Sequence, residues 1–261
     1  MTRVTSSVNS PAGEFAGRAA LVTGASRGIG LGIAHSLVSR GARVVITARH
    51  AEALGDAVAA LGGPEHAIAV AGNAGDPGHR KAAVAAAVES LGGLDMLVAN
   101  VGINPVFGPL IDTDLDAVKK ILDTNVVATL GLIQRAWHGW MAAHGGSILI
   151  VSSVAGLRAS QGIAAYGVSK AALINLTAQL AVELGPAVRV NAIAPAVIKP
   201  RFAEALYVGR EDEVARQYPA GRLGVPEDAG EAAAYLLGPG AGWVTGQVLV
   251  IDGGATARGG V

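Results

Sequence analysis

The stretch Ala19-Ala20-Leu21-Val22-Thr23-Gly24-Ala25-Ser26-Arg27-Gly28-Ile29-Gly30 decides the fold. Its first four residues form a short apolar run, which predicts a buried parallel strand. A glycine turn follows, and apolar residues then recur with helical spacing until Gly41. A strand, a glycine turn and a helix in this order form the setting of a dinucleotide-binding turn. The sequence therefore predicts an α/β fold with a nucleotide site near its N-terminus.

The spacing of the three glycines, G-x-x-x-G-x-G, gives each of them a physical task. Gly24 allows the tight turn, Gly28 lets the backbone approach a pyrophosphate, and Gly30 lets the helix pack closely on the strand. The helix presents free N–H groups and the positive end of its dipole to the phosphates. We therefore expect the dinucleotide to be held here by Gly24, Ser26, Arg27, Gly28, Ile29 and Gly30.

Short apolar runs alternate with helical patterns along the whole chain, and this alternation is typical of a parallel sheet covered by helices. The expected strands are 18–23, 43–48, 66–71, 94–99, 146–151, 187–193 and 247–251. The expected helices are 28–40, 51–61, 77–91, 113–143 with a break, 164–184 and 226–237, with a shorter pair around 200–217. The predicted fold class is α/β: a single Rossmann-type, doubly wound parallel sheet of about seven strands with helices on both faces.

The composition of the 261 residues excludes several kinds of site and partner. The 20 basic and 20 acidic residues balance, which argues against a nucleic-acid-binding surface. The chain has no cysteine and its histidines lack metal-ligand spacing, so we expect neither a disulfide framework nor a metal site. No apolar run reaches the ~18 residues of a membrane span, and the N-terminus lacks the apolar core of a secretory signal. We expect a cytoplasmic protein without membrane or nucleic-acid partners.

A second group of residues predicts chemistry as well as binding. Tyr166 and Lys170 are four residues apart, and Ser153 precedes the tyrosine by thirteen. Residues four apart share one helix face, so the Lys170 ammonium can lie near the Tyr166 phenol. A free phenol has a pKa of about 10, and a neighbouring cation lowers that pKa. Because a general acid or base works best with a pKa near the working pH, we interpret the pair as a tuned proton donor.

Together these motifs resemble the short-chain dehydrogenase/reductase family, and the resemblance covers roughly residues 17–254. It rests on Thr23-Gly24-x-x-x-Gly28-x-Gly30, on Asn100-Val101-Gly102 after a strand, and on Asn125, Ser153, Tyr166 and Lys170, all in the order of the family. The resemblance implies a single Rossmann-type domain and a nicotinamide cofactor. It also implies hydride transfer between that cofactor and a carbonyl or alcohol.

The resemblance implies a role for each catalytic candidate. Ser153 would hydrogen-bond the substrate oxygen and stabilise the charge that develops on it. Tyr166 would deliver or remove the proton, and Lys170 would lower the pKa of Tyr166 and hold the nicotinamide ribose. Asn125 would interrupt its helix and hold a water that links Lys170 to solvent. The other cofactor contacts implied are Asn73, Ala74, Asn100, Gly102, Tyr166, Lys170, Pro195 and Ile198.

The end of the second predicted strand indicates which nicotinamide cofactor is used. Enzymes that use NAD usually carry an acidic residue there for the ribose hydroxyls, about 20 residues beyond the glycine turn. This chain has Ala48 at that place and Arg49 next to it, and an arginine can pair bidentately with a 2′-phosphate. With Arg27 as a second cation, the sequence favours NADP(H).

Two departures from the family pattern bear on cofactor binding. Asn73 replaces the aspartate that commonly contacts adenine, but its amide oxygen can still accept a hydrogen bond from the adenine amine. Pro200 stands where a threonine often contacts the nicotinamide amide, and proline has no N–H to donate. We therefore expect the backbone near Ile198 to anchor the nicotinamide.

The sequence also predicts how the chain is divided. Residues 1–16 are expected to form a flexible N-terminal tail, and 17–261 a single domain in which about 197–222 form a substrate lid. The side chains expected on the inner surface of the lid are apolar or aromatic: Phe202, Leu206, Tyr207 and Tyr218. The expected substrate is a small ketone or secondary alcohol with a largely apolar body.

Three functions stay open at this point. An NADPH-dependent carbonyl reductase acting on a free small molecule is favoured. The alternative is a 3-oxoacyl-carrier-protein reductase, which needs a basic docking surface; His144 and the Pro186-Ala187 turn stand where such reductases carry arginines. The third is a non-catalytic protein that senses NADP(H) or acts as a scaffold, against which the retained Tyr166 and Lys170 argue.

The resemblance finally implies self-association. The family commonly forms tetramers through the long helices before the fifth strand and after Tyr166, and through the last helix and strand. The apolar residues expected on these surfaces are Trp137, Trp140, Leu173, Leu176 and Trp243-Val244-Thr245-Gly246. Only 15% of the chain is charged, and large exposed apolar patches are unusual on monomers. We therefore expect a homotetramer.

Overall fold

A parallel sheet of seven strands runs through the computed structural model, which describes residues 13–198, 215–216 and 218–257. The strands lie in the order β3-β2-β1-β4-β5-β6-β7, and every neighbouring pair is parallel. They are β1 (Ala19–Thr23), β2 (Arg43–Ala48), β3 (Ala67–Ala71), β4 (Met96–Ala99), β5 (Gly146–Val151), β6 (Val188–Pro195) and β7 (Val248–Ile251). The predicted fold class is confirmed, and the strand ends differ from the prediction by at most two residues.

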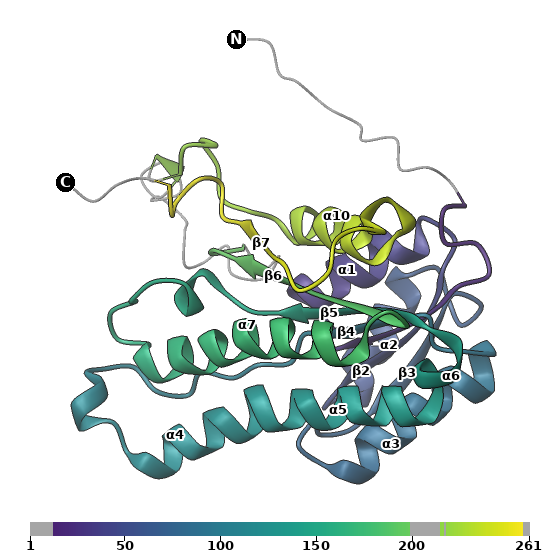
Figure 1. Cartoon of the computed structure of the whole chain (residues 1–261), viewed down its shortest axis with the longest axis horizontal. Coiled ribbons are helices and arrows are strands. Elements are labelled where there is room, and N and C mark those ends of the chain that lie inside the picture. The colour runs from purple at the N-terminus through teal and green to yellow at the C-terminus, as the bar shows by residue number, and fades with distance from the viewer. Residues whose placement is uncertain (1–12, 199–214, 217, 258–261) are drawn as a thin grey trace.

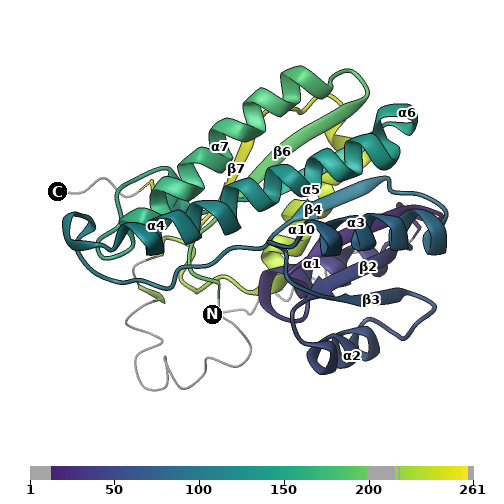
Figure 2. The same cartoon turned by 90° about the horizontal axis from the view of Figure 1, so that it is seen from below.

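Helices cover both faces of the sheet (Figures 1 and 2). One face carries α1 (Gly28–Val38), α2 (Ala51–Ala60) and α10 (Pro226–Leu237). The other carries α3 (Pro77–Ala86), α4 (Leu115–Leu122), α5 (Ala128–Ala136), α6 (Ala142–His144) and α7 (Ala164–Leu184). The expected helix pair around 200–217 falls mainly outside the described residues. Within the described part of the chain, none of the helices combines the length and the apolar character that a membrane crossing requires.

The central strands are apolar on both faces because both faces are covered. Successive strand residues point to opposite sides, so Val44 and Ile46 pack under α1 and α2 while Val45 packs under the opposite helices. All three side chains are fully buried. This is why the strands appear in the sequence as continuous apolar runs and not as alternating ones.

The long helical region before β5 is interrupted where the sequence predicted a break. Between α4 and α5 the chain forms a π-helical turn over Asp123–Val127, with Asn125 at its centre. A second π turn, Trp137–Met141, joins α5 to α6. Single π turns inside helices occur often at functional sites, and the first one lies beside the candidate site described below.

The predicted N-terminal tail is too long. Phe15 is 2% exposed and packs into the core beside α1, and its N–H donates to the carbonyl oxygen of Arg40 at 2.8 Å. The Glu14 carboxylate lies 3.5 Å from Nε of the same Arg40. Residues 13–16 are therefore part of the packed structure, because a buried aromatic ring holds them, whereas 1–12 lie outside the described residues.

Candidate active site

The predicted site residues gather along the carboxyl edge of the sheet. Arg49 follows β2, Asn73 follows β3, and the glycine turn follows β1. Asn100 follows β4, Ser153 follows β5, and Pro195 ends β6. The chain order reverses between the neighbouring strands β1 and β4, and open α/β sheets bind their ligands at such a reversal.

Asn100 ties the glycine turn to β4. Its Nδ2 donates to the carbonyl oxygens of Thr23 and Gly24 at 2.9 and 3.2 Å, and its own N–H donates to the Thr23 hydroxyl at 3.0 Å. A Cβ on Gly30 would lie 2.7 Å from this Nδ2 and would overlap the Gly24 carbonyl. The turn and the first helical turn of α1 are therefore packed too closely for any larger residue at Gly30.

The N-terminus of α1 fits a pyrophosphate. Arg27 is the N-cap residue, its side chain makes no capping hydrogen bond, and the first turn carries no acidic residue. The first N–H groups of a helix have no partner inside the helix, and the N-cap side chain supplies none here. Gly28 has φ +59° and open space around the position of a Cβ. This region therefore offers free donors and room for an anion, as a nicotinamide dinucleotide requires.

Ser153, Tyr166 and Lys170 come together as the sequence predicted. Ser153 caps the short helical turn Val154–Gly156, where its Oγ accepts a hydrogen bond from the N–H of Ala155 at 3.2 Å. Tyr166 lies in the first turn of α7, where the Ser153 side chain is close enough to influence the pKa of its phenol. Nζ of Lys170, one turn later, lies 5.4 Å from the centre of the Tyr166 ring.

Three further residues, which the sequence analysis did not identify, hold this group in place. A Cβ on Gly156 would lie 2.6 Å from the carbonyl carbon of Lys170, and a Cβ on Gly167 would lie 2.7 Å from the carbonyl oxygen of Ala155. Ser152 donates from its hydroxyl to the Lys170 carbonyl at 2.8 Å. The two glycines let the turn after β5 and helix α7 touch backbone to backbone. Ser152, Gly156 and Gly167 lie within three residues of Ser153 or Tyr166 in the sequence, and this closeness could have identified them as candidates.

Lys170 is a buried cation. It is 2% exposed, and its Nζ donates to the carbonyl oxygen of Val151 at 2.8 Å. A Cβ on Gly102 would lie 3.1 Å from that Nζ, so the glycine leaves room for the ammonium. Burial lowers the pKa of Lys170 from 10.5 to about 8, because the charged form loses its hydration.

We expect Lys170→Met to stabilise the ligand-free protein at pH 7. The pKa of Lys170 is about 8 in the folded protein and 10.5 in the unfolded chain. Below pH 8 the amine is protonated in both states, but the proton is bound less tightly in the folded state, so burial of the charge destabilises the fold. That difference corresponds to at most about 3 kcal/mol of destabilisation, which disappears as the pH rises from 8 to 10.5. The unfolding temperatures of variant and wild type should therefore converge over this pH range. Exposed Lys120→Met is the control, and an equal gap at pH 7 and pH 10 would contradict the assignment.

The expected lowering of the Tyr166 pKa is wrong for this structure. Burial raises the pKa of Tyr166 above 10, and the nearby Ser153 side chain offsets this only in part. The physical reason is that loss of hydration disfavours the phenolate more strongly than the surroundings favour it. The phenol therefore keeps its proton at neutral pH and is available as a donor.

Asn125 joins the loop after β4 to helix α7. It is fully buried, and its Oδ1 accepts from the N–H of Ile103 at 2.7 Å. Its Nδ2 donates to the carbonyl oxygen of Ile103 at 3.0 Å and to the Ser169 hydroxyl at 2.9 Å. The predicted interruption of the helix at Asn125 is confirmed, and its predicted water stays a prediction.

The edge expected for the adenosine half of the cofactor carries exposed cations, and Ala48 and Arg49 occupy the strand end where an acid would bind the ribose hydroxyls. Arg27 and Arg49 are both exposed, and neither forms an ion pair with any described residue. Asn73 is exposed, and its Oδ1 accepts from the N–H of Gly75 at 3.0 Å. An amide oxygen has two lone pairs, so this bond leaves one for a ligand.

A cavity of about 390 Å³ opens beyond the ends of β6 and β7, where the substrate end of the site was predicted. Ile198, Tyr218 and Arg222 are among its lining residues, and Ile198 forms a backbone bridge with Gly224. Arg222 is held by two hydrogen bonds to the Asp228 carboxylate, at 2.6 and 2.7 Å. Most of the predicted lid, with Pro200, Phe202, Leu206 and Tyr207, lies outside the described residues.

Comparison with known proteins places this geometry in a family. A family model described as enoyl-(acyl carrier protein) reductase matches residues 24–256. Dehydrogenase/reductase SDR family member 4 from Homo sapiens is 38% identical over 250 residues, which cover 94% of this chain and 89% of that protein. The chain belongs to the short-chain dehydrogenase/reductase family. The protein of the same name from Caenorhabditis elegans is 35% identical over 253 residues, covering 94% of this chain and 97% of that protein.

Solved structures of short-chain dehydrogenases/reductases share the fold. A short-chain type dehydrogenase/reductase from Mycobacterium ulcerans superposes with a TM-score of 0.87 at 34% identity, covering 94% of this chain and 92% of that one. A protein described as short-chain dehydrogenase/reductase and glucose/ribitol dehydrogenase, from Brucella melitensis, superposes with a TM-score of 0.86 at 32% identity, covering 94% and 98%. The chain is therefore an oxidoreductase of a family that uses nicotinamide cofactors on small molecules.

Proposed function

We propose that this short-chain dehydrogenase/reductase transfers hydride between NADP(H) and the ketone or secondary alcohol of a small, largely apolar substrate. The observation that carries the proposal is the arrangement of Ser153, Tyr166 and Lys170. A protonated phenol lies near a serine hydroxyl at the carboxyl edge of the sheet, and the Nζ atom of a buried lysine lies 5.4 Å from the centre of the phenol ring.

Ser153, Tyr166, Lys170 and Asn125 each have a separate role in the proposed reaction. NADP(H), when bound, would supply or accept the hydride. The Ser153 hydroxyl donates to the substrate oxygen and stabilises the charge that grows there during reduction. Tyr166 donates its phenolic proton to the same oxygen, and in oxidation it takes that proton back. Lys170 holds its ammonium beside Gly102, where the nicotinamide ribose would lie, and Asn125 fixes the loop that contains Gly102.

The choice of NADP(H) rests on charge. Arg49 is exposed at the carboxyl end of β2 and unpaired by any described carboxylate, and Ala48 offers no acceptor for ribose hydroxyls. A 2′-phosphate would give Arg49 a bidentate partner. Arg27 at the N-cap of α1 adds a second positive charge on the same edge.

A carrier-bound substrate is the second candidate, because the matching family model is described as an acyl-carrier-protein reductase. The positions that would need basic residues, His144 and Pro186, lie just before β5 and β6, whereas Ser153 follows β5. Neither position supplies an arginine, so this chain lacks the basic side chains that carrier docking was expected to need there.

The test is oxidation of NADPH against a panel of free ketones, with and without the matching carrier-bound 3-oxoacyl and enoyl substrates. Turnover of a free ketone supports the proposal. If only the carrier-bound substrates are turned over, the protein is a carrier-dependent reductase and the proposal of a free-ketone substrate is wrong. The absence of turnover with every substrate, despite tight NADPH binding, would favour a non-catalytic sensor or scaffold.

The apolar residues expected on the subunit surfaces differ in exposure, and the most exposed of them supports an assembly larger than a monomer. Leu173 is 1% exposed inside its own chain, and Trp137, Trp140 and Leu176 pack against the same core. Leu173 is therefore a core residue, whereas the two tryptophans and Leu176 keep part of their surface exposed. Trp243, in contrast, is fully exposed, and so is most of Val182 on α7.

We expect light scattering at micromolar concentration to give four times the 26.0 kDa chain mass. Burial of Trp243 and of the exposed valines of α7 would supply the apolar area that holds the subunits together. Trp243→Ser combined with Val182→Lys should shift the protein toward smaller species, while the exposed change Lys120→Met should not. A monomer for the wild type would refute the tetramer.

A further inference from the structure

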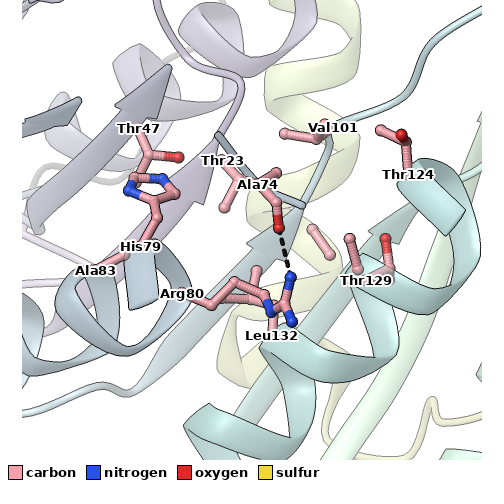
Figure 3. Close-up of a pocket in the computed structure, with 12 residues that line it drawn as sticks. Thr23, Thr47, Ala74, His79, Arg80, Ala83, Val101, Thr124, Thr129 and Leu132 are labelled. Atoms are coloured by element: carbon pink, nitrogen blue, oxygen red, sulfur yellow. Dashed lines mark hydrogen bonds between the residues drawn. The ribbon is translucent and has the colours of Figure 1, made fainter. Parts of the chain in front are cut away.

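A small cavity lies next to the loop expected to hold adenine, between helices α3 and α5 (Figure 3). Its walls include Ala74, Val101, Thr124 and Arg80. Ala74 directly follows Asn73, and Val101 directly follows Asn100, so the cavity borders two segments of the proposed cofactor site. With about 20 Å³ of space it has room for about one water.

Arg80 reaches across this cavity from α3 toward α5, as Figure 3 shows. Its Nη1 donates to the carbonyl oxygen of Ala74 at 2.8 Å. Its Nε is buried and has no hydrogen-bond partner among the described residues. On the α5 side a Cβ at Gly131 would lie 3.1 Å from that Nε, so the glycine leaves room for the guanidinium.

This arrangement is unfavourable for the fold alone. Within the described residues no carboxylate pairs with Arg80, and the nearest acid along α3, Asp76, uses its carboxylate to cap the N–H of Gly78 at 2.8 Å. A partly buried charge loses hydration, and without a counter-ion no ion pair offsets this free-energy cost. A glycine inside α5 also weakens that helix. Local rules are broken in this way mostly where function requires it.

We propose that Arg80 is a positioning residue for the adenosine end of the cofactor. The inference rests on the proposed function, because it needs a nucleotide at this edge. By holding the Ala74 carbonyl, Arg80 fixes the Asn73–Ala74 loop in the shape that receives the adenine. Its unpartnered Nε belongs to a side chain that lines a cavity with room for about one water, so a water there could satisfy this donor.

The experiment measures the affinities of NADPH and of adenosine 2′,5′-bisphosphate, together with the unfolding temperature of the ligand-free protein. Arg80→Met keeps much of the side-chain volume and removes the donors and the charge. We expect both affinities to fall about tenfold, the effect of losing one charge-assisted hydrogen bond, with the unfolding temperature unchanged or higher. Lys81→Met, which removes an exposed charge from the next position of α3, should leave both affinities within twofold.

The outcomes separate positioning from a purely structural role. Equal losses for NADPH and for the bisphosphate support the inference, since the effect then lies wholly at the adenosine end. Unchanged affinities with a lower unfolding temperature would make Arg80 a structural latch and overturn it, as would a loss seen for NADPH but not for the bisphosphate.

Two further observations keep the test decisive. If Arg80→Met does not fold, Arg80→Gln, which keeps a neutral donor for Ala74, is judged by the same two affinities. If the wild type binds NADH more tightly than NADPH, the pair NADH and 5′-ADP is used instead, and only the cofactor assignment fails. A wild type that binds neither cofactor refutes the proposed function itself, and this inference with it.

Discussion

Replacing Tyr166 with phenylalanine is expected to lower kcat for ketone reduction by ~10²–10⁴-fold, the usual contribution of a general acid. The change removes one oxygen and leaves the ring in place above Lys170, so NADPH affinity should stay close to that of the wild type. The structure sharpens this expectation, because burial raises the pKa of Tyr166 and keeps its proton in place at neutral pH.

Two comparisons make the Tyr166 result specific. Tyr235→Phe removes the same oxygen from a half-exposed tyrosine on α10 and should leave kcat unchanged. The direction of reaction adds a second check: a raised pKa predicts that alcohol oxidation, which needs the deprotonated phenol, gains rate as the pH rises. A Tyr166→Phe variant that turned over near the wild-type rate would show that another group donates the proton.

Replacing Arg49 with alanine is expected to weaken NADPH by about ten- to a hundredfold and to change NADH little. Hydrogen bonds to charged groups are worth roughly 1.5–3 kcal/mol, and ~1.4 kcal/mol corresponds to tenfold in affinity. Only NADPH has the 2′-phosphate that Arg49 would bind. Because Arg49 is exposed, salt should screen the interaction, and the loss should shrink at high ionic strength.

The combined change Ala48→Asp with Arg49→Ala should shift the preference further toward NADH. The new carboxylate would accept a hydrogen bond from a ribose hydroxyl and repel a phosphate at the end of β2. Arg135→Ala, which removes an exposed charge from α5, is the control for net charge. The measurement is kcat/KM for both cofactors in all variants. A wild type that prefers NADH, or an Arg49→Ala variant that weakens both cofactors equally, would make Arg49 an ordinary surface charge.

The sequence by itself determined the fold class and the place of the site. Apolar runs of four to six residues between helical patterns located all seven strands, because a parallel strand buried on both faces must be continuously apolar. The glycine spacing after β1 and the separation of Tyr166 from Lys170 are local features of a turn and of a helix. Such local features depend on neighbouring residues in the sequence and not on tertiary packing. Their positions at the carboxyl edge could therefore be predicted.

Only the tertiary structure decided what surrounds each of these groups. Whether Tyr166 is acidified by Lys170 or made less acidic by burial depends on how closely α7 packs on the turn after β5, and that approach is set by Gly156 and Gly167. Residues distant in sequence bury Phe15 in the core, and they also bury Nε of Arg80 without a hydrogen-bond partner among the described residues. Spacing along the chain tells which side chains share a face, but burial, and with it pKa and charge compensation, is a property of the packed molecule.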